Sequence, residues 1–172
     1  LNGFRGLAGV WKQLQSLPLL RRFLLSYFFA CTGVQTVLYV ATPFAEETLK
    51  MSGNALIVTI LILQILGVAG AVMFSRLSSA AGNVRALALA ILVWAFVCIG
   101  GYFVQAGWSF YLLACGIGIA MGGVQSLSRS TYAKLLPENV HDTASFFSFF
   151  DVTEKIGIVI GTASFSAISA IS

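Results

Sequence analysis

Four polar side chains lie on one face of the helix that residues 22–44 predict. They are Thr32, Gln35, Thr36 and Tyr39, at positions i, i+3, i+4 and i+7, and the intervening positions are mostly apolar. Lipid cannot hydrogen-bond such a stripe, so it should face a water-filled cavity or another protein helix. We favour a cavity that contacts a polar solute, because Gln35 and Tyr39 together exceed what simple bonding between helices needs. Hydrogen bonding between helices remains the alternative.

A second group of polar residues follows Phe146, at the start of the last apolar run. Asp151 and Lys155 are separated by one helical turn, with Glu154 beside them. An ion pair between Asp151 and Lys155 would reduce the cost of burying a charge in a bilayer, about 3 kcal/mol per residue. This group is either a site for substrate binding or proton coupling, or the charged end of a helix in the headgroup region.

Two isolated amides also interrupt apolar runs, Gln64 and Gln125. Each is costly in lipid unless it is paired, so each points weakly to the same cavity. The residues needed for an enzyme or a metal site are not grouped: the single histidine, His141, stands in a turn without a nucleophile or ligand cluster spaced to join it. The three cysteines are far apart within apolar runs. We therefore expect no enzyme activity, no metal and no cofactor.

The composition defines the class of protein in which these residues sit. The chain has 172 residues, of which 58% are hydrophobic and only 9% charged. Soluble domains have about 25% charged residues, so this chain has too little polar surface to be covered by water. A net charge of +4 is small and concentrated in a few loops, which indicates membrane topology and excludes nucleic acid as the expected partner.

Five apolar segments are each about as long as the ~20 residues that a helix needs to cross a bilayer. The predicted fold is therefore all-α, a polytopic transmembrane helix bundle. Residues 1–21 precede the bundle (22–172) as an amphipathic arm on the membrane surface, or as a disordered linker, since Pro18 interrupts the pattern. The helices are expected near residues 22–44, 54–75, 86–105, 108–127 and 144–172.

Basic residues predict the orientation. Almost all of them lie in the arm and in the loops after the second and fourth segments, whereas Lys50 alone lies on the opposite side, so the arm is expected to be cytoplasmic. Five crossings and the abrupt ends indicate part of a larger bundle. Small residues spaced by four predict tight packing of the fourth and fifth segments: Ala114, Gly118 and Gly122, then Gly157 and Gly161.

The stretch from Arg76 to Arg85 resembles the loop motif of the major facilitator superfamily, with Leu77 and Gly82 at matching positions and Ser79 where the motif has an acid. Longer stretches resemble one branch of that superfamily, the vacuole-effluxer, autophagy-related permeases. The resemblance runs from Arg22 to Gly161 and is to the C-terminal half, from the seventh helix into the eleventh. The stretches are GVQTVLY (33–39), AEE (45–47), ALIVTILILQ (55–64), GGVQSLSRSTYAKLLPE (122–138) and FFSFFDVTEKIGIVIG (146–161).

This resemblance implies a secondary transporter with six helices per half, a solute site between the halves and alternating access. Fungal members are implicated in exporting amino acids from the vacuole. Thr32 stands where the family pattern commonly has Asp, which argues against a proton-coupling role for the first segment. The expected solute contacts are Gln35, Thr36, Tyr39, Gln64, Gln125, Asp151, Glu154 and Lys155.

Three arginines, Arg76, Arg85 and Arg129, are candidates for a cytoplasmic gate against the missing half, although setting topology is the favoured interpretation. The expected partners are the lipid bilayer, a small polar solute such as an amino acid, the N-terminal half of the transporter, and a second copy of the fragment. We expect a multi-pass protein of a bacterial inner membrane. A non-transporting membrane scaffold and a membrane-embedded enzyme that uses His141 are the alternatives.

Overall fold

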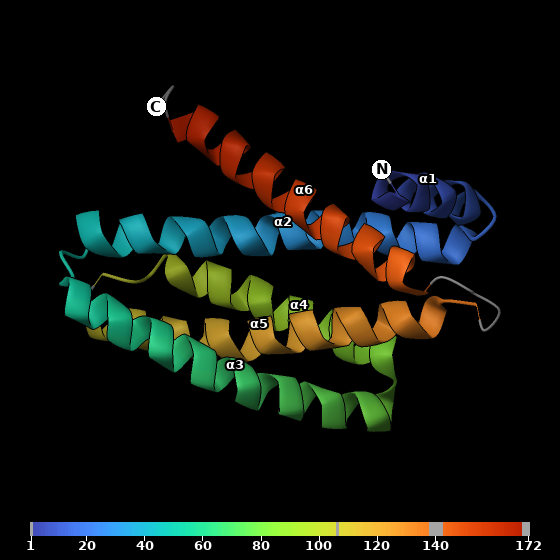
Figure 1. Cartoon of the computed structure of the whole chain (residues 1–172). Helices are drawn as coiled ribbons and strands as arrows, with labels where there is room; N and C mark the ends of the chain where they lie inside the picture. The colour runs from blue at the N-terminus through green and yellow to red at the C-terminus, as the bar shows by residue number, and fades with distance from the viewer. Residues whose placement is uncertain (1, 106, 138–142, 170–172) are drawn as a thin grey trace. The chain divides into compact units, whose positions relative to one another are not determined.

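The computed structural model describes residues 2–105, 107–137 and 143–169, and within these ranges every regular element is an α-helix (Figure 1). This confirms the all-α fold class. The six helices are α1 (Asn2–Gln15), α2 (Pro18–Glu47), α3 (Gly53–Ala81), α4 (Asn83–Gly101), α5 (Gly107–Leu135) and α6 (Thr143–Ser169).

Four of these helices, α2 to α5, are long and apolar enough to cross a membrane. Helix α6 is of similar length but is not one of the four. Its first half carries Asp151, Glu154 and Lys155, which shorten its apolar run. A fifth crossing by α6 therefore stays a prediction.

The sequence predicted a loop from Arg76 to Arg85. This prediction is wrong, because the stretch is helical on both sides of one turn residue, Gly82. Helix α3 runs to Ala81, α4 begins at Asn83, and Gly82 has φ +90°. A side chain is strained at such a φ, so glycine suits this turn. Polar residues past the apolar run still form helix, which is why α3 is longer than expected. A proline lies at the break between α1 and α2. Pro18 is the first residue of α2, a position where the backbone N–H would have no hydrogen-bond partner within the helix.

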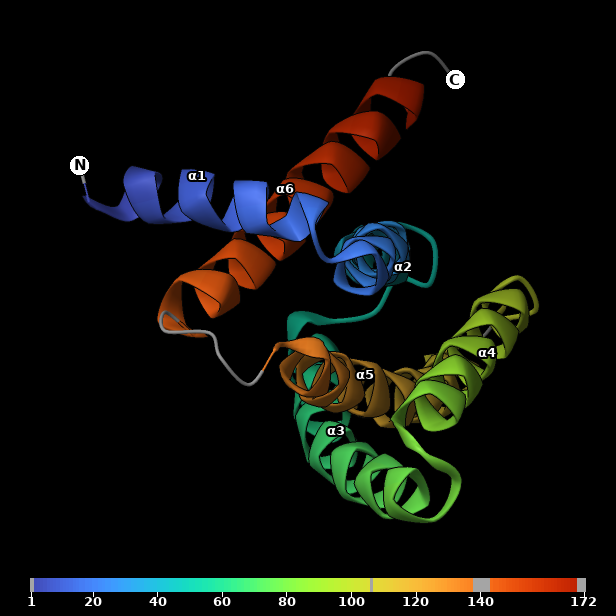
Figure 2. The same ribbon diagram turned by 90° about the vertical axis from the view of Figure 1, so that its right-hand side faces the viewer.

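The chain divides into two compact units, Leu1–Thr36 with Tyr132–Ser172, and Val37–Thr131. In the first unit α1 packs against α6 (Figure 2). Val10 and Leu14 of α1 are buried, and the Trp11 ring lies 6.2 Å from the ring of Phe149. The described part of the arm is thus helical with an apolar side facing protein, and its position on a membrane surface remains a prediction.

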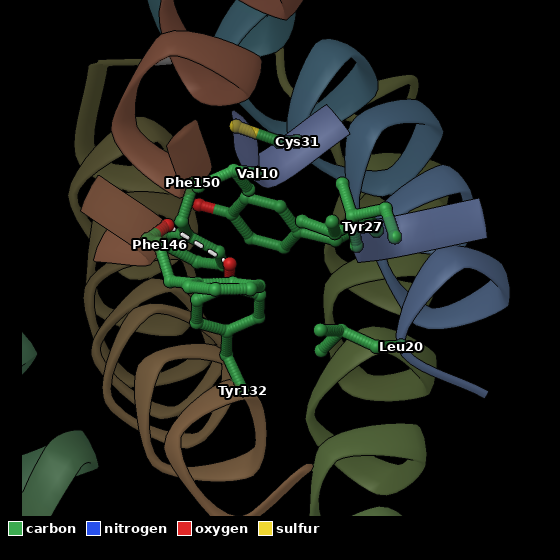
Figure 3. Packing of buried hydrophobic residues seen from close by; sticks show 9 residues of the cluster. Val10, Leu20, Tyr27, Cys31, Tyr132, Phe146 and Phe150 are labelled. Carbon is green, nitrogen blue, oxygen red and sulfur yellow. Dashed lines mark hydrogen bonds between the residues drawn. The ribbon is translucent and has the colours of Figure 1, made fainter. Parts of the chain in front are cut away.

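Aromatic side chains form the core of this first unit (Figure 3). Tyr132, Phe146 and Phe150 are at most 1% exposed, and the Phe150 ring lies 4.3 Å from that of Tyr27 and 4.8 Å from that of Tyr132. The Tyr132 hydroxyl donates a 2.8 Å hydrogen bond to the Phe146 carbonyl. This bond links the last turns of α5 to the first turns of α6, and it satisfies a hydroxyl that has no access to water.

Helices α2 and α6 approach closely in the first unit through glycine. A Cβ added to Gly157 would lie 2.9 Å from the Thr32 hydroxyl oxygen, and one added to Gly161 would overlap the Thr36 hydroxyl. Both threonine hydroxyls donate 2.7 Å bonds to carbonyls of their own helix, at Phe28 and Thr32. Such bonding satisfies the hydroxyls without water, so this is a packed seam.

In the second unit α3, α4 and α5 lie side by side (Figures 1 and 2). A buried cluster joins all three helices through Phe74, Ala86, Ala90, Val124 and Leu127. Glycines bring α5 against α3: a Cβ on Gly118 would lie 2.8 Å from the Leu63 carbonyl oxygen. The sequence predicted tight packing of the fourth and fifth segments. In the structure α5 packs closely against α3, and α6 packs closely against α2.

Candidate solute-binding site

The second unit contains a cavity of about 540 Å³ between α3 and α5, which Leu38 of α2 also lines. The lining positions repeat at i, i+3, i+4, i+7, i+8 and i+11 on both helices, so each helix contributes one continuous face. Those on α3 are Ile60, Leu63, Gln64, Gly67, Val68 and Ala71. Those on α5 are Gly118, Met121, Gly122, Gln125, Ser126 and Arg129.

Glycine forms the part of the lining where the two helices touch. A Cβ added to Gly122 would overlap the Gly67 carbonyl oxygen, and one added to Gly67 would lie 3.7 Å from the Gly118 carbonyl oxygen. Backbone therefore meets backbone there. At this contact the cavity lining consists of backbone, whereas leucine, isoleucine, valine and methionine side chains line much of the rest.

Four polar side chains line the cavity: Gln64, Gln125, Ser126 and Arg129. Gln64, Gln125 and Arg129 are exposed, and the Ser126 hydroxyl donates a 3.3 Å bond to the Gly123 carbonyl. Amides donate and accept hydrogen bonds, whereas a guanidinium carries five donors and a fixed positive charge. The cavity is therefore equipped to hold a polar solute without chemical change.

The polar groups lie at different depths. Gly118 packs at the level of Leu63, next to Gln64. Gln125 is seven residues further along α5, or about 10 Å at 1.5 Å per residue. Arg129 follows one turn later. The sequence singled out Gln64 and Gln125 separately, and the structure places both in the lining of one cavity, on α3 and α5. The lining also includes Arg129, which the sequence assigned to a gate or to topology.

The four polar residues of the stripe expected on α2 are not among the residues that line this cavity. From α2 the lining includes Leu38, the apolar residue next to Tyr39. Thr36 packs against Gly161, as described above, and Gln35 is half-buried. Tyr39, beside Leu38, is 58% exposed. The structure thus places Thr36 in a helix seam, whereas Tyr39 stays available at the surface.

The charged group on α6 belongs to the first unit. The Tyr27 hydroxyl donates a 3.2 Å bond to Glu154 Oε2, while Asp151 is half-buried and Lys155 is exposed. Glu154 is thus tied to the aromatic core through a residue 127 positions away, a link that no local pattern could reveal. His141 lies outside the described residues.

The other two arginines of the expected gate lie on either side of the turn at Gly82. Arg76 in α3 and Arg85 in α4 are exposed. The sequence missed Asn83, which holds this turn: its Oδ1 accepts a bond from Ser78 Oγ, and its Nδ2 donates to Ser130 Oγ of α5 at 2.9 Å. The sequence signal that could have identified Asn83 is its position directly after the glycine of the turn.

Among the described residues, no three His, Cys, Asp or Glu side chains are grouped to hold a metal. The three cysteines are unpaired thiols: Cys31 is buried, Cys115 is half-buried and Cys98 is exposed. Within the described part of the chain, the cavity is the feature best suited to a function.

Comparisons with known proteins support transport. The chain is 27% identical over 161 residues to the uncharacterized MFS-type transporter YxiO of Bacillus subtilis, a match that covers 94% of the chain and 37% of the relative. It is 32% identical over 172 residues to autophagy-related protein 22 of Yarrowia lipolytica, covering 92% of the chain and 28% of the relative. For autophagy-related protein 22 of Cryptococcus neoformans the identity is 31%, covering 92% and 32%.

The chain therefore spans about a third of the length of these curated relatives. No solved structure matches it. The apolar helices and the transporter relatives make it an integral, multi-pass membrane protein, and the relatives are transporters, not enzymes. The vacuole effluxer Atg22-like family matches residues 1–171. The chain belongs to that family.

Proposed function

We propose that the chain forms the C-terminal half of a secondary transporter and that its α3–α5 cavity is one wall of the solute path. The observation that carries this proposal is the pair of continuous helix faces that line one cavity and bring Gln64 and Gln125 to it. In alternating-access transporters the substrate site lies between the halves, so each half contributes part of its lining. The relatives are about three times as long as the chain, which leaves room for a second half to close the cavity.

The proposed solute is small and polar, with amino acids as the first class to test. Gln64 and Gln125 are its proposed contacts, and Tyr39 beside Leu38 is a further one. The charged residues of α6, with Glu154 bonded to Tyr27, are proposed to act in the conformational change or in coupling. The arm is proposed to lie on the cytoplasmic side of a bacterial inner membrane, as the basic residues indicate.

Accessibility to water tests the proposal directly. Single cysteines replace Gln64 or Gln125 in the intact protein, after Cys31, Cys98 and Cys115 are changed to alanine. Both sites should react with a charged, membrane-impermeant maleimide in open membranes, because a solute path contains water. Ile65→Cys is the matched control: Ile65 follows Gln64, is 69% exposed and does not line the cavity, so it should stay unlabelled.

Labelling is then repeated with excess amino acid, which should protect Gln64→Cys and Gln125→Cys. If both cavity positions are as inert as the Ile65 control, the cavity does not conduct a polar solute. That outcome would favour the alternative of a non-transporting membrane scaffold, in which these amides serve only to join helices.

A further inference from the structure

We propose that α1 and the start of α2 form a binding surface for the headgroups of anionic phospholipids, with Trp11, Lys12, Arg21 and Arg22 as its contacts. This surface is independent of the proposed solute path, because its residues belong to the first unit whereas those lining the α3–α5 cavity belong to the second. The direction of α1, the side on which it is exposed and the sign of the exposed charge all point to lipid headgroups.

Helix α1 lies across the start of α2 instead of continuing its direction. Figure 2 shows α1 lengthwise and α2 end-on, although only two residues separate the helices. The Leu17 N–H donates to the Leu14 carbonyl at 3.1 Å, so the connection is a tight turn. Because α2 is long and apolar enough to cross a membrane, a helix that lies across its end runs along the membrane surface, at the level of the headgroups.

One side of the described part of α1 packs on protein, and another side is exposed. Val10 and Leu14, one turn apart, are buried in the core that α1 shares with α6. The neighbouring side carries Trp11, which is 59% exposed, and Lys12, which is exposed as well. Since the buried side is already covered by protein, the exposed side is the one that meets the headgroups. Tryptophan and lysine are both typical of helices at this level of a membrane.

The exposed charge at this end of the first unit is positive. Lys12, Arg21 and Arg22 are all exposed. The first acidic residue of the chain is Glu46, near the other end of α2 and about 36 Å from Arg22 at 1.5 Å per residue. A positive surface at headgroup level attracts anionic lipids, and each basic residue there raises the affinity about five-fold.

The acidic residues that α6 adds to this unit do not reverse that sign. Asp151 and Glu154 are half-buried, and the Tyr27 hydroxyl bonds to Glu154. Among the described residues of the first unit, every charged side chain that is exposed is therefore basic.

Anionic lipid fits this surface better than a soluble acidic protein. The basic residues adjoin a membrane-spanning helix, so headgroups lie beside them at high local concentration. A soluble partner would have to displace those lipids. Trp11 adds an aromatic side chain of the type enriched where a membrane meets water.

The test places a photoreactive residue at position 11 of the intact protein. Trp11→p-benzoylphenylalanine is reconstituted in vesicles of equal parts phosphatidylglycerol and phosphatidylcholine and irradiated, and lipid adducts at this position are counted by mass spectrometry. Phosphatidylglycerol adducts should exceed phosphatidylcholine adducts at least about five-fold, the contribution of one basic residue. Combining Lys12→Gln, Arg21→Gln and Arg22→Gln should bring the ratio close to one. About 0.5 M NaCl should do the same without these substitutions, because salt screens exposed charge.

Tyr102 provides the matched control. It is an aromatic residue that is 87% exposed, and no charged residue stands between Arg85 and Arg129 in the sequence. Tyr102→p-benzoylphenylalanine should therefore capture the two lipids in similar amounts. As a control for charge, Arg76→Gln combined with Arg85→Gln, at two exposed positions of the second unit, should leave the ratio at position 11 unchanged.

Three results would overturn the proposal: equal capture of both lipids at position 11, an excess of phosphatidylglycerol that survives in the triple glutamine variant, or crosslinking of position 11 to a protein and not to lipid. The triple variant is first shown to be folded by its thermal unfolding. Should it not fold, the salt measurement decides, because an excess that persists in about 0.5 M NaCl also contradicts recognition by exposed charge.

Discussion

Replacing Gly70 with alanine should separate α3 from α5, on whose contact the cavity depends. Gly70 is buried, and a Cβ added there would lie 2.7 Å from Ile119 Cα and 2.8 Å from its carbonyl carbon, and would overlap the carbonyl oxygen. Carbon atoms in contact are about 3.5–4.0 Å apart. Because the obstructing atoms are backbone, no rotamer change can relieve the clash, and the helices must move apart by about 1 Å.

Two effects set the size of the loss. Overpacking a well-packed interior costs about 1–3 kcal/mol, and a backbone obstacle belongs at the upper end of that range. Alanine is a better helix former than glycine by up to about 1 kcal/mol, which offsets part of the cost. We therefore expect the free energy of unfolding to fall by roughly 2 kcal/mol, which is about a 30-fold change in the ratio of folded to unfolded protein.

The measurement is reversible unfolding in mixed micelles as the fraction of denaturing detergent is raised. Gly33→Ala is the control, because a Cβ at Gly33 in α2 meets nothing within 4 Å, and the variant should be at least as stable as the unmodified protein. If Gly70→Ala is within about 0.5 kcal/mol of the unmodified protein, a difference typical of surface substitutions, the close approach of α3 and α5 is wrong.

Two smaller changes test other contacts. Asn83→Ala should speed amide hydrogen exchange at the α3–α4 turn, because it removes the bonds from Asn83 to α5; exchange as slow as in the unmodified protein would contradict that role. Tyr132→Phe should lower the free energy of unfolding by about 1 kcal/mol through the lost bond to the Phe146 carbonyl, whereas Tyr102→Phe, at an 87% exposed side chain, should have no effect; equal stabilities would refute the difference.

Helix positions were largely predictable from hydrophobicity, but their ends and partners were not. The apolar run ending near residue 75 gave no sign that α3 continues to Ala81, because serine and alanine are compatible with helix outside the hydrocarbon region. Glycines four apart identified helix faces that pack closely. That spacing specifies a face and not its partner, so it could not tell that Gly122 meets Gly67 or that Gly161 meets Thr36.

The candidate site shows the same limit. Gln64 and Gln125 stood out because an isolated amide in an apolar run is costly. Arg129 was named only as a candidate for the gate or for setting topology, because a basic residue near a helix end has an ordinary explanation in membrane topology. Its place in the cavity lining depends on the register of α3 against α5, which the glycine contacts between the two helices define. The pairing of Tyr27 with Glu154 likewise depends on the tertiary fold.

That register also explains why close packing and polar groups share one stripe of α5. Gly118 and Gly122 hold the helix against the α3 backbone, and Gln125, Ser126 and Arg129 follow on the same face. A longer side chain at either glycine would push α5 outward and move these three polar side chains with it, since a helix is stiff over two turns. The glycines thus determine where these polar side chains of the cavity lining stand. Packing and recognition in this cavity therefore depend on one helix face, so a change to either glycine should alter both together.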